Sequence, residues 1–207
     1  MKPITAILAP LGIVVIAGAA WWLLRPTDSD QFAACRSTEI GTGVASIGGP
    51  FTLVDENGTT VTDADVFTKP TLLYFGYTFC PDVCPLDSTR NADALDLLQD
   101  RGYDAQAVFI SIDPERDTPE RVAEFTDLMH DDMIGLTGSL EQVKVASQAY
   151  KTYFRKEEDG DPEYYLVDHS TFTYLVLPEH GFLEFFRRDE TPEGMAEKTA
   201  CFIDAAK

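Results

Sequence analysis

Residues 71–85 read TLLYFGYTFCPDVCP, an apolar run that ends in two cysteines, each followed by a proline. The uncharged run Thr71–Tyr77 predicts a strand that is buried on both faces of a sheet. The apolar residues after it lie largely on one helical face, so we expect a helix over Pro85–Gln99 with Cys84 near its N-cap. Free N–H groups at a helix start stabilise a thiolate, which makes Cys80 and Cys84 candidate nucleophiles and candidate ligands of a soft metal. The alternative is two buried cysteines that only fill the core.

The rest of the chain alternates strand and helix patterns in the same way. We expect strands at Ala107–Ile112, Tyr174–Leu177 and Phe182–Phe186, and helices over residues 118–130, 139–151 and 192–205. Asn57-Gly58, flanked by the strand-forming runs 51–54 and 59–62, predicts an N-terminal β-hairpin with a two-residue turn. This order predicts an α/β fold with a mixed sheet. In such folds reactive groups collect where parallel strands end, which here is the turn after Tyr77.

The composition limits the classes of partner. The 207 residues include 44% hydrophobic residues, enough for an ordinary core, and 35 acidic side chains against 16 basic ones. A formal net charge of -19 makes a nucleic-acid partner unfavourable, because nucleic acids attract basic surfaces. A cation, a basic partner or a neutral partner fits this charge.

An uncharged segment precedes the acidic part of the chain. Residues 4–24 carry no charged side chain, and a helix of that length spans about 31 Å, the thickness of a bilayer core. A buried core helix would show a polar face, and a cleaved signal peptide would end in small residues, whereas this segment ends in Trp21-Trp22-Leu23-Leu24. We therefore expect a membrane anchor over residues 1–25, a tether over residues 26–46 and a single domain over residues 47–207.

Three histidines are candidates for a third metal ligand, because two thiolates alone under-coordinate most metals. His130 ends a helix beside two carboxylates, and His180 lies in the tip of a predicted hairpin, so we expect both to be solvated. His169 lies among apolar residues just before a predicted strand. A lone histidine in such a place is ordinarily structural, and only proximity to the cysteines would make it a ligand.

Four motifs in this order resemble the Sco/SenC family from about Phe51 to the C-terminus. They are FGYTFCPDVCP at residues 75–85, SIDPERDTP at 111–119, LTG at 136–138 and DHS at 168–170. The resemblance implies a thioredoxin-like fold that faces the periplasm or the mitochondrial intermembrane space. It also implies that Cys80, Cys84 and His169 bind copper, as Cu(I) or Cu(II).

The same resemblance implies a role in the assembly of cytochrome c oxidase. The protein would deliver copper to the binuclear copper site of subunit II, or reduce the cysteines of that site. Its expected partners are that subunit, a copper donor protein and a thiol reductant such as a thioredoxin-like protein. The absence of an arginine-rich transit segment favours a bacterial inner membrane, with the domain in the periplasm, over a mitochondrial one.

Two other functions are compatible with the cysteine pair. A thiol–disulfide oxidoreductase would use Cys80 and Cys84 as its redox pair, although the spacing is Cys-x-x-x-Cys and Ser170-Thr171 stands where thioredoxins have a proline. A peroxidase is the weaker alternative, since Thr78 is only two residues before Cys80. Whether the protein is an enzyme therefore depends on what these thiols do.

The sequence also predicts roles for single residues near these motifs. In the segment 113–119 we expect Arg116 to pair with Asp117 and Thr118 to cap the next helix. Asp168 is a candidate for orienting the His169 ring, and the acidic segment 157–163 is a candidate mobile loop. Cys35 and Cys201 form an even leftover pair, so a disulfide between them is an open possibility in an oxidising compartment.

Overall fold

The computed structural model describes residues 30–36, 47–157 and 164–207. The chain divides into two compact units, Met1–Ala34 and Cys35–Lys207. In the first unit only residues 30–34 are described, and there the Asp30 carboxylate accepts a hydrogen bond from the Phe32 N–H at 3.0 Å. The predicted anchor, most of the predicted tether and the acidic loop at 158–163 lie outside the described residues. Within the described ranges, no helix is both long enough and apolar enough to cross a membrane.

The second unit is built on a seven-stranded sheet with the order β2-β1-β5-β4-β3-β8-β9. Its strands are β1 (Thr52–Asp55), β2 (Thr60–Thr62), β3 (Thr71–Gly76), β4 (Gln106–Ser111), β5 (Met133–Thr137), β8 (Thr173–Leu177) and β9 (Gly181–Phe186). Strands β3, β4 and β5 are parallel, whereas β1 and β8 run antiparallel to their neighbours β5 and β3. The sheet is therefore mixed, as the sequence predicts.

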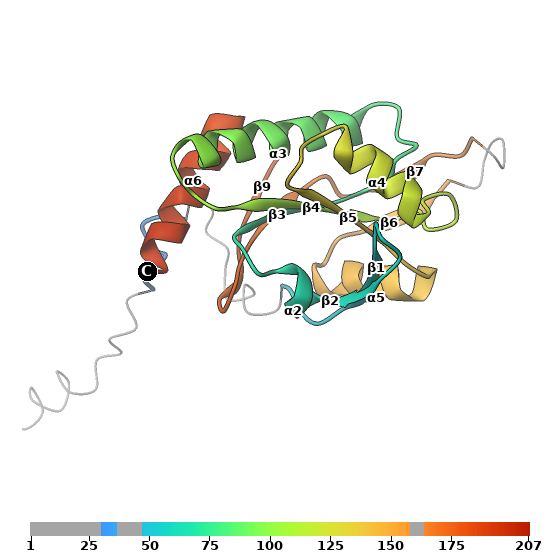
Figure 1. Ribbon diagram of the computed structural model, residues 1–207, viewed down its shortest axis with the longest axis horizontal. Coiled ribbons are helices and arrows are strands. Elements are labelled where there is room, and N and C mark those ends of the chain that lie inside the picture. The colour runs from blue at the N-terminus through green and yellow to red at the C-terminus, as the bar shows by residue number, and fades with distance from the viewer. Residues whose placement is uncertain (1–29, 37–46, 158–163) are drawn as a thin grey trace, which may run out of the picture. The chain divides into compact units, whose positions relative to one another are not determined.

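Helices cover both faces of this sheet. They are α2 (Asp63–Val66), α3 (Val83–Asp100), α4 (Pro119–Asp127), α5 (Leu140–Ala149) and α6 (Pro192–Ala205). Figure 1 shows α3 and α4 above the sheet and α5 below it, with α6 starting beside α3 and running down past the left edge of the sheet. All six residues of β3 and all six of β4 are buried, because these central strands are covered from both sides.

Three strands have no counterpart in the sequence analysis. Strands β6 (Phe154–Lys156) and β7 (Val167–His169) form a separate two-stranded sheet, and three residues are too few to show a period. Strand β5 is continuous, but Gly135 interrupts its apolar sequence pattern. Helix α4 approaches closely there, since a Cβ at this position would lie 3.0 Å from the Val122 Cβ. Short strands of this kind are defined by their partners rather than by their own pattern.

The N-terminal hairpin forms, but its predicted two-residue turn is wrong. The Asp55 N–H donates to the Thr59 carbonyl at 2.9 Å, so the loop contains three residues, 56–58. The Asp55 carboxylate also accepts hydrogen bonds from the N–H groups of Asn57 and Thr59. Gly58 adopts a φ of +77°, the left-handed conformation that closes a three-residue loop.

A disulfide joins Cys35 to Cys201 in α6, across 166 residues of sequence. The disulfide that the sequence left open is thus confirmed, and Cys80 and Cys84 are free thiols. Next to the disulfide, the Arg36 guanidinium donates to the Leu183 carbonyl at 2.6 Å and lies 6.0 Å from the centre of the Phe202 ring. The disulfide therefore ties the start of the second unit to its last helix, and the Arg36 hydrogen bond ties it to β9.

We expect Cys201→Ser to lower the free energy of unfolding by about 2–4 kcal/mol, since a bond that closes a long loop restricts the unfolded chain. Guanidinium denaturation measures the change. Cys35→Ser should cost the same amount, and the double variant should cost no more than either single one, because all three remove the same bond. Additive losses in the double variant would contradict this account.

Candidate metal centre

Cys80 and Cys84 lie in the connection from β3 to α3. Helix α3 begins at Val83 after the N-cap residue Asp82, two residues earlier than the predicted start at Pro85. Cys84 is therefore the second residue of the helix, and its predicted place near the N-cap is confirmed. Pro85 is tolerated there because the N–H groups of a first turn have no partner within the helix. The Cys84 N–H instead donates to the Cys80 Sγ at 3.4 Å.

Gly76, the last residue of β3, allows Cys84 to pack against the end of the strand. A Cβ at this position would lie 2.8 Å from Tyr74 Cε1, 2.9 Å from Phe109 Cε2 and 3.1 Å from Cys84 Sγ. Such distances are too short for any side chain without a shift of its neighbours. A glycine is therefore required where strand and helix approach.

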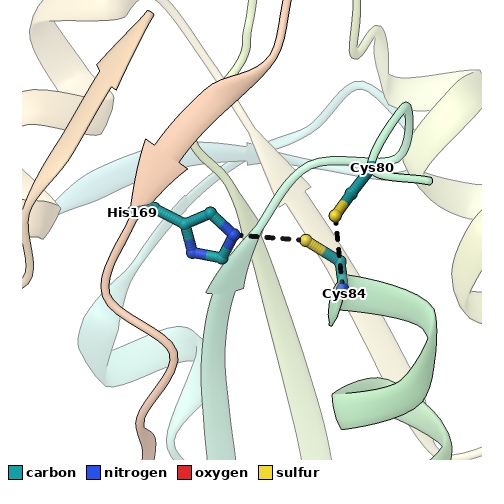
Figure 2. A group of neighbouring side chains, drawn as sticks. All are labelled: Cys80, Cys84 and His169. Carbon is teal, nitrogen blue, oxygen red and sulfur yellow. Dashed lines mark hydrogen bonds between the residues drawn. The ribbon is translucent and has the colours of Figure 1, made fainter. Parts of the chain in front are cut away.

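His169, at the end of β7, directs its Nε2 atom at Cys84, and the two atoms Nε2 and Sγ lie 3.4 Å apart (Figure 2). Its Nδ1 atom lies 2.8 Å from the Ser170 carbonyl oxygen, which can only accept a hydrogen bond. In the neutral ring Nδ1 therefore carries the hydrogen, and the Nε2 lone pair faces the cysteines. The rings of Tyr74 and Tyr77 pack edge-on against the imidazole, with centroids 6.3 and 5.8 Å away.

The expected orienting role of Asp168 is wrong. The side chain of Asp168 is exposed, and Nδ1 is held by the Ser170 carbonyl instead. Successive residues of a strand point to opposite faces, so a carboxylate next to His169 is directed away from the ring.

The three candidate donors converge, although 85 residues separate Cys84 from His169. The two sulfur atoms and one ring nitrogen all lie within 4.8 Å of one another. Figure 2 shows Cys80 above Cys84, with the imidazole reaching Cys84 from the other side. The other two histidines are elsewhere: His130 lies 3.2 Å from the Asp96 carboxylate, and His180 is exposed in the β8–β9 turn.

The two thiols differ in acidity. A hydrogen bond from the Cys84 thiol lowers the pKa of Cys80 to about 3, against burial, which raises it. Burial raises the pKa of Cys84 above its ordinary value. Without a metal the pair therefore holds one proton, and Cys80 is the thiolate.

Asp117 anchors the loop that carries Cys80. Its carboxylate accepts hydrogen bonds from the N–H and the hydroxyl of Thr78, at 3.0 and 2.6 Å, and from the Ser111 hydroxyl at 2.5 Å. Burial raises the pKa of this carboxyl above its usual range, whereas these hydrogen bonds lower it. Asp117 thereby ties the loop after β3 to the end of β4. The point of attachment in the loop is Thr78, two residues before Cys80.

The predicted pair of Arg116 with Asp117 is wrong, because Asp117 points inward to Thr78. Arg116 instead donates to the Asp113 carboxylate at 2.5 Å, and its guanidinium lies 3.6 Å from the centre of the Tyr165 ring. The Tyr165 hydroxyl donates to the same carboxylate at 2.6 Å. The Arg116 N–H also donates to the Asp113 carbonyl at 3.1 Å, and this turn brings the side chains of Asp113 and Arg116 together. The predicted cap is confirmed, since the Thr118 side chain accepts from the Arg121 N–H.

Sequence reasoning missed several residues that position the site. The Tyr74 hydroxyl donates to the buried Asp87 carboxylate at 3.0 Å, on the turn of α3 after Cys84. The Tyr77 hydroxyl accepts from the Val167 N–H at 3.3 Å and so joins the β3 end to β7. The sequence did offer a signal for Gly76, because an isolated glycine inside an apolar strand pattern indicates that another segment approaches the backbone closely. Tyr74 and Tyr77 carried none, because aromatic residues in such a run are ordinary core residues.

The donor set indicates which metal the site fits. Two soft thiolates and one imidazole suit copper, and Cu(I) accepts three-coordination, whereas structural zinc sites take four ligands. A metal-binding histidine also needs contacts that fix the orientation of its ring. His169 has them, since its Nδ1 is hydrogen-bonded to the Ser170 carbonyl and its ring packs against Tyr74 and Tyr77. The fold and the site together define a thioredoxin-like protein with a Cys-Cys-His centre that fits copper.

Comparison with known proteins gives the family. The family model described as SCO1/SenC matches residues 40–204, and the chain belongs to this family. Protein SenC of Rhodobacter capsulatus is 57% identical over 203 residues, which cover 97% of this chain and 90% of that protein.

Solved structures agree with the assignment. The crystal structure of Arabidopsis thaliana ScoI with copper bound is 40% identical and has a TM-score of 0.71, covering 76% of this chain and 99% of that one. A structure of BsSco, described as having a disulfide switch and as a member of the Sco family of cytochrome c oxidase assembly proteins, is 25% identical. Its TM-score is 0.59, and it covers 76% of this chain and 90% of that one.

We expect iodoacetamide to alkylate Cys80 before Cys84 in the reduced, metal-free protein, at a rate nearly constant between about pH 5 and pH 8. The pKa of Cys80, at about 3, lies below this range, so the thiolate fraction does not change with pH. Peptide mass spectrometry over time measures both sites. In Cys84→Ala the hydrogen-bond donor is lost, the pKa of Cys80 should rise, and the rate should climb with pH. A wild-type rate that climbs in the same way would contradict the prediction.

Proposed function

We propose that this chain is a membrane-anchored copper metallochaperone of cytochrome c oxidase assembly. Cys80, Cys84 and His169 are its copper ligands, and copper is its cargo. Its acceptor is the binuclear copper site of subunit II, and a separate copper donor protein loads it. Residues 4–24 hold it in a bacterial inner membrane with the domain in the periplasm. Membership of the family, the copper-bound Arabidopsis structure and the oxidase-assembly description of BsSco support this proposal.

One observation carries it: the Nε2 atom of His169 lies 3.4 Å from Cys84 Sγ while its Nδ1 is held by the Ser170 carbonyl. A purely structural histidine has no need to present a lone pair to a sulfur. The imidazole is fixed in the tautomer that binds a metal, and the deprotonated Cys80 is the second donor at hand.

A small ligand set suits transfer better than storage. Two thiolates and one Cu(I) carry a net charge of -1, and three protein donors leave room for a thiolate of the acceptor to join. Copper then moves by exchange of ligands, one at a time, without being released to water. The exposed Phe79 and Tyr164, with ring centroids 6.4 Å apart, lie close in sequence to Cys80 and His169 and offer apolar surface for such a contact.

We expect His169→Ala to weaken Cu(I) binding by more than about tenfold, because loss of an outer hydrogen bond alone costs that much at a metal site. Competition with a chelator of known Cu(I) affinity measures the change. His130→Ala and His180→Ala are matched controls that should bind copper like the wild type. Unchanged retention in His169→Ala would exclude this ligand set, and loss in either control would show that another histidine is the ligand.

The alternative function is thiol–disulfide exchange at the same two cysteines. The Cys80 thiolate would attack a disulfide of the partner to form a mixed disulfide, and the Cys84 thiol would then attack Cys80, releasing the reduced partner. The resulting Cys80–Cys84 disulfide needs a thiol reductant, such as a thioredoxin-like protein, to restore it. The low pKa of Cys80 and the disulfide switch described for BsSco favour retaining this candidate.

Insulin reduction by the metal-free protein, with an added thiol reductant that regenerates the cysteine pair, separates the two functions. We expect turnover to be slow in comparison with a thioredoxin, because Cys84 is fully buried with its pKa raised and is a poor second nucleophile. Cys84→Ser, which blocks resolution of the mixed disulfide, is the control. Fast turnover combined with negligible affinity for Cu(I) would favour the oxidoreductase.

A further inference from the structure

The strand that carries His169 lies outside the main sheet. Strands β6 and β7 form a two-stranded sheet of their own, joined by three residue pairs. Within the described ranges, β7 therefore has no strand partner in the seven-stranded sheet from which the cysteine loop emerges. Two short strands alone are marginally stable in water. The distance between the imidazole and the sulfur atoms thus depends on contacts of side chains.

Arg116 contacts both the segment that leads to His169 and the loop that carries Cys80. Its guanidinium carbon lies 3.6 Å from the centre of the Tyr165 ring and 4.8 Å from the centre of the Phe79 ring. Tyr165 is four residues before His169, and Phe79 immediately precedes Cys80. A guanidinium within about 6 Å of an aromatic ring is attracted to it. One side chain therefore joins the two segments whose separation sets the geometry of the metal centre.

Asp113 fixes this arrangement from the end of β4. Its carboxylate is buried, and one oxygen accepts from Arg116 Nε at 2.5 Å while the other accepts from the Tyr165 hydroxyl at 2.6 Å. The Asp113 N–H donates to the hydroxyl of Ser111, the last residue of β4, at 3.0 Å. Hydrogen bonds to a charged group are stronger than those between neutral groups. Asp113 therefore holds Arg116 and Tyr165 together at the edge of the main sheet.

Other polar contacts between the β6–β7 hairpin and the rest of the domain are weaker. Lys156 lies 2.6 Å from the Glu115 carboxylate, but these side chains are 45% and 59% exposed. Exposed ion pairs contribute little. The Val167 N–H donates to the Tyr77 hydroxyl at 3.3 Å, which is a single hydrogen bond. The Arg116 side chain, in contrast, is only 13% exposed, so its contacts are shielded from water and salt.

We propose that Arg116 is a positioning residue for His169. Held by Asp113, it keeps the residues before His169 against the loop that carries Cys80, so that the imidazole faces the sulfur atoms before copper arrives. Arg116 acts through Tyr165 and not as a ligand, because a guanidinium has no lone pair to offer a metal. The inference rests on the copper ligands proposed above and assigns a role to the motif at residues 111–119.

Hydrogen exchange in the metal-free full chain, with Cys80 and Cys84 reduced, tests this without copper. The Val167 N–H bonds to Tyr77, so its exchange, followed by NMR, reports separation of β7 from the cysteine loop. We expect Arg116→Gln to accelerate it at least about fivefold, because a local opening becomes easier. The Val108 N–H in the buried strand β4 should exchange as in the wild type.

Two further variants make this measurement specific. Arg121→Gln is the matched control, because the Arg121 guanidinium also lies over the Phe79 ring, at 5.8 Å, but belongs to the exposed side of α4. It should leave the exchange of Val167 unchanged. Tyr165→Phe removes only the hydroxyl that Asp113 accepts from, and should accelerate the exchange by a smaller factor. This milder variant tests the proposal even where Arg116→Gln does not fold.

Competition for Cu(I) with a chelator shows whether Arg116 acts through the imidazole. We expect Arg116→Gln to weaken Cu(I) binding about tenfold, as loss of an outer contact does at a metal site. In the His169→Ala background the same substitution should cost nothing more, because the residue that it positions is gone. A general loss of structure would instead cost the same in both backgrounds.

Three results would overturn the proposal: unchanged Val167 exchange in Arg116→Gln and Tyr165→Phe, equal acceleration at Val108, or an equal cost of Arg116→Gln with and without His169. Copper loss in His169→Ala but none in Arg116→Gln would also overturn it, and would leave the ligand set standing. Unchanged copper retention in His169→Ala would exclude the ligand set instead, and the exchange of Val167 would then decide by itself whether Arg116 holds β7 in place.

Discussion

The close packing of Cys84 against the end of β3 is the constraint on which the rest of the site depends. A glycine at residue 76 leaves room for this approach, since a Cβ there would lie 2.8 Å from the Tyr74 ring and 2.9 Å from the Phe109 ring, and 3.1 Å from the Cys84 sulfur. With Cys84 buried there, its N–H faces Cys80 and its sulfur faces His169. Burial also raises the pKa of Cys84, which leaves Cys80 as the thiolate of the pair.

Two further connections fix the position of the cysteine loop relative to the contact between Cys84 and β3. Asp117 ties the loop before Cys80 to the end of β4, and the Tyr77 hydroxyl ties the same loop to β7. Each uses a polar group that is mostly buried, where an unpaired partner is costly. The cysteine loop is thus connected both to the central sheet and to the strand that supplies the imidazole, so its donors are positioned before any metal arrives.

The order of strands and helices was predictable, because long apolar runs such as Thr71–Tyr77 and capped helices such as α4 carry strong local patterns. The predictions of local structure were wrong or incomplete where tertiary contacts override the local preference of the sequence. The Cys84 N–H at the start of α3 donates to the Cys80 sulfur, and the turn after Asp55 is held by the Asp55 carboxylate. The short strands β5, β6 and β7 are defined by the strands that they pair with. A pattern read along one segment does not contain those partners.

By itself the sequence determined the chemistry available: two thiols at a strand-to-helix turn, three histidines from which to choose, and a family resemblance carried by ordered motifs. Three contacts became visible only in the folded molecule: His169 reaches Cys84, the Ser170 carbonyl fixes the tautomer of His169, and Asp117 binds Thr78 rather than Arg116. The physical reason is distance along the chain. The contact across 39 residues depends on the pairing of β3 with β4, and the contact across 85 residues depends on the Tyr77–Val167 hydrogen bond that joins β7 to the end of β3. No local pattern specifies either of them.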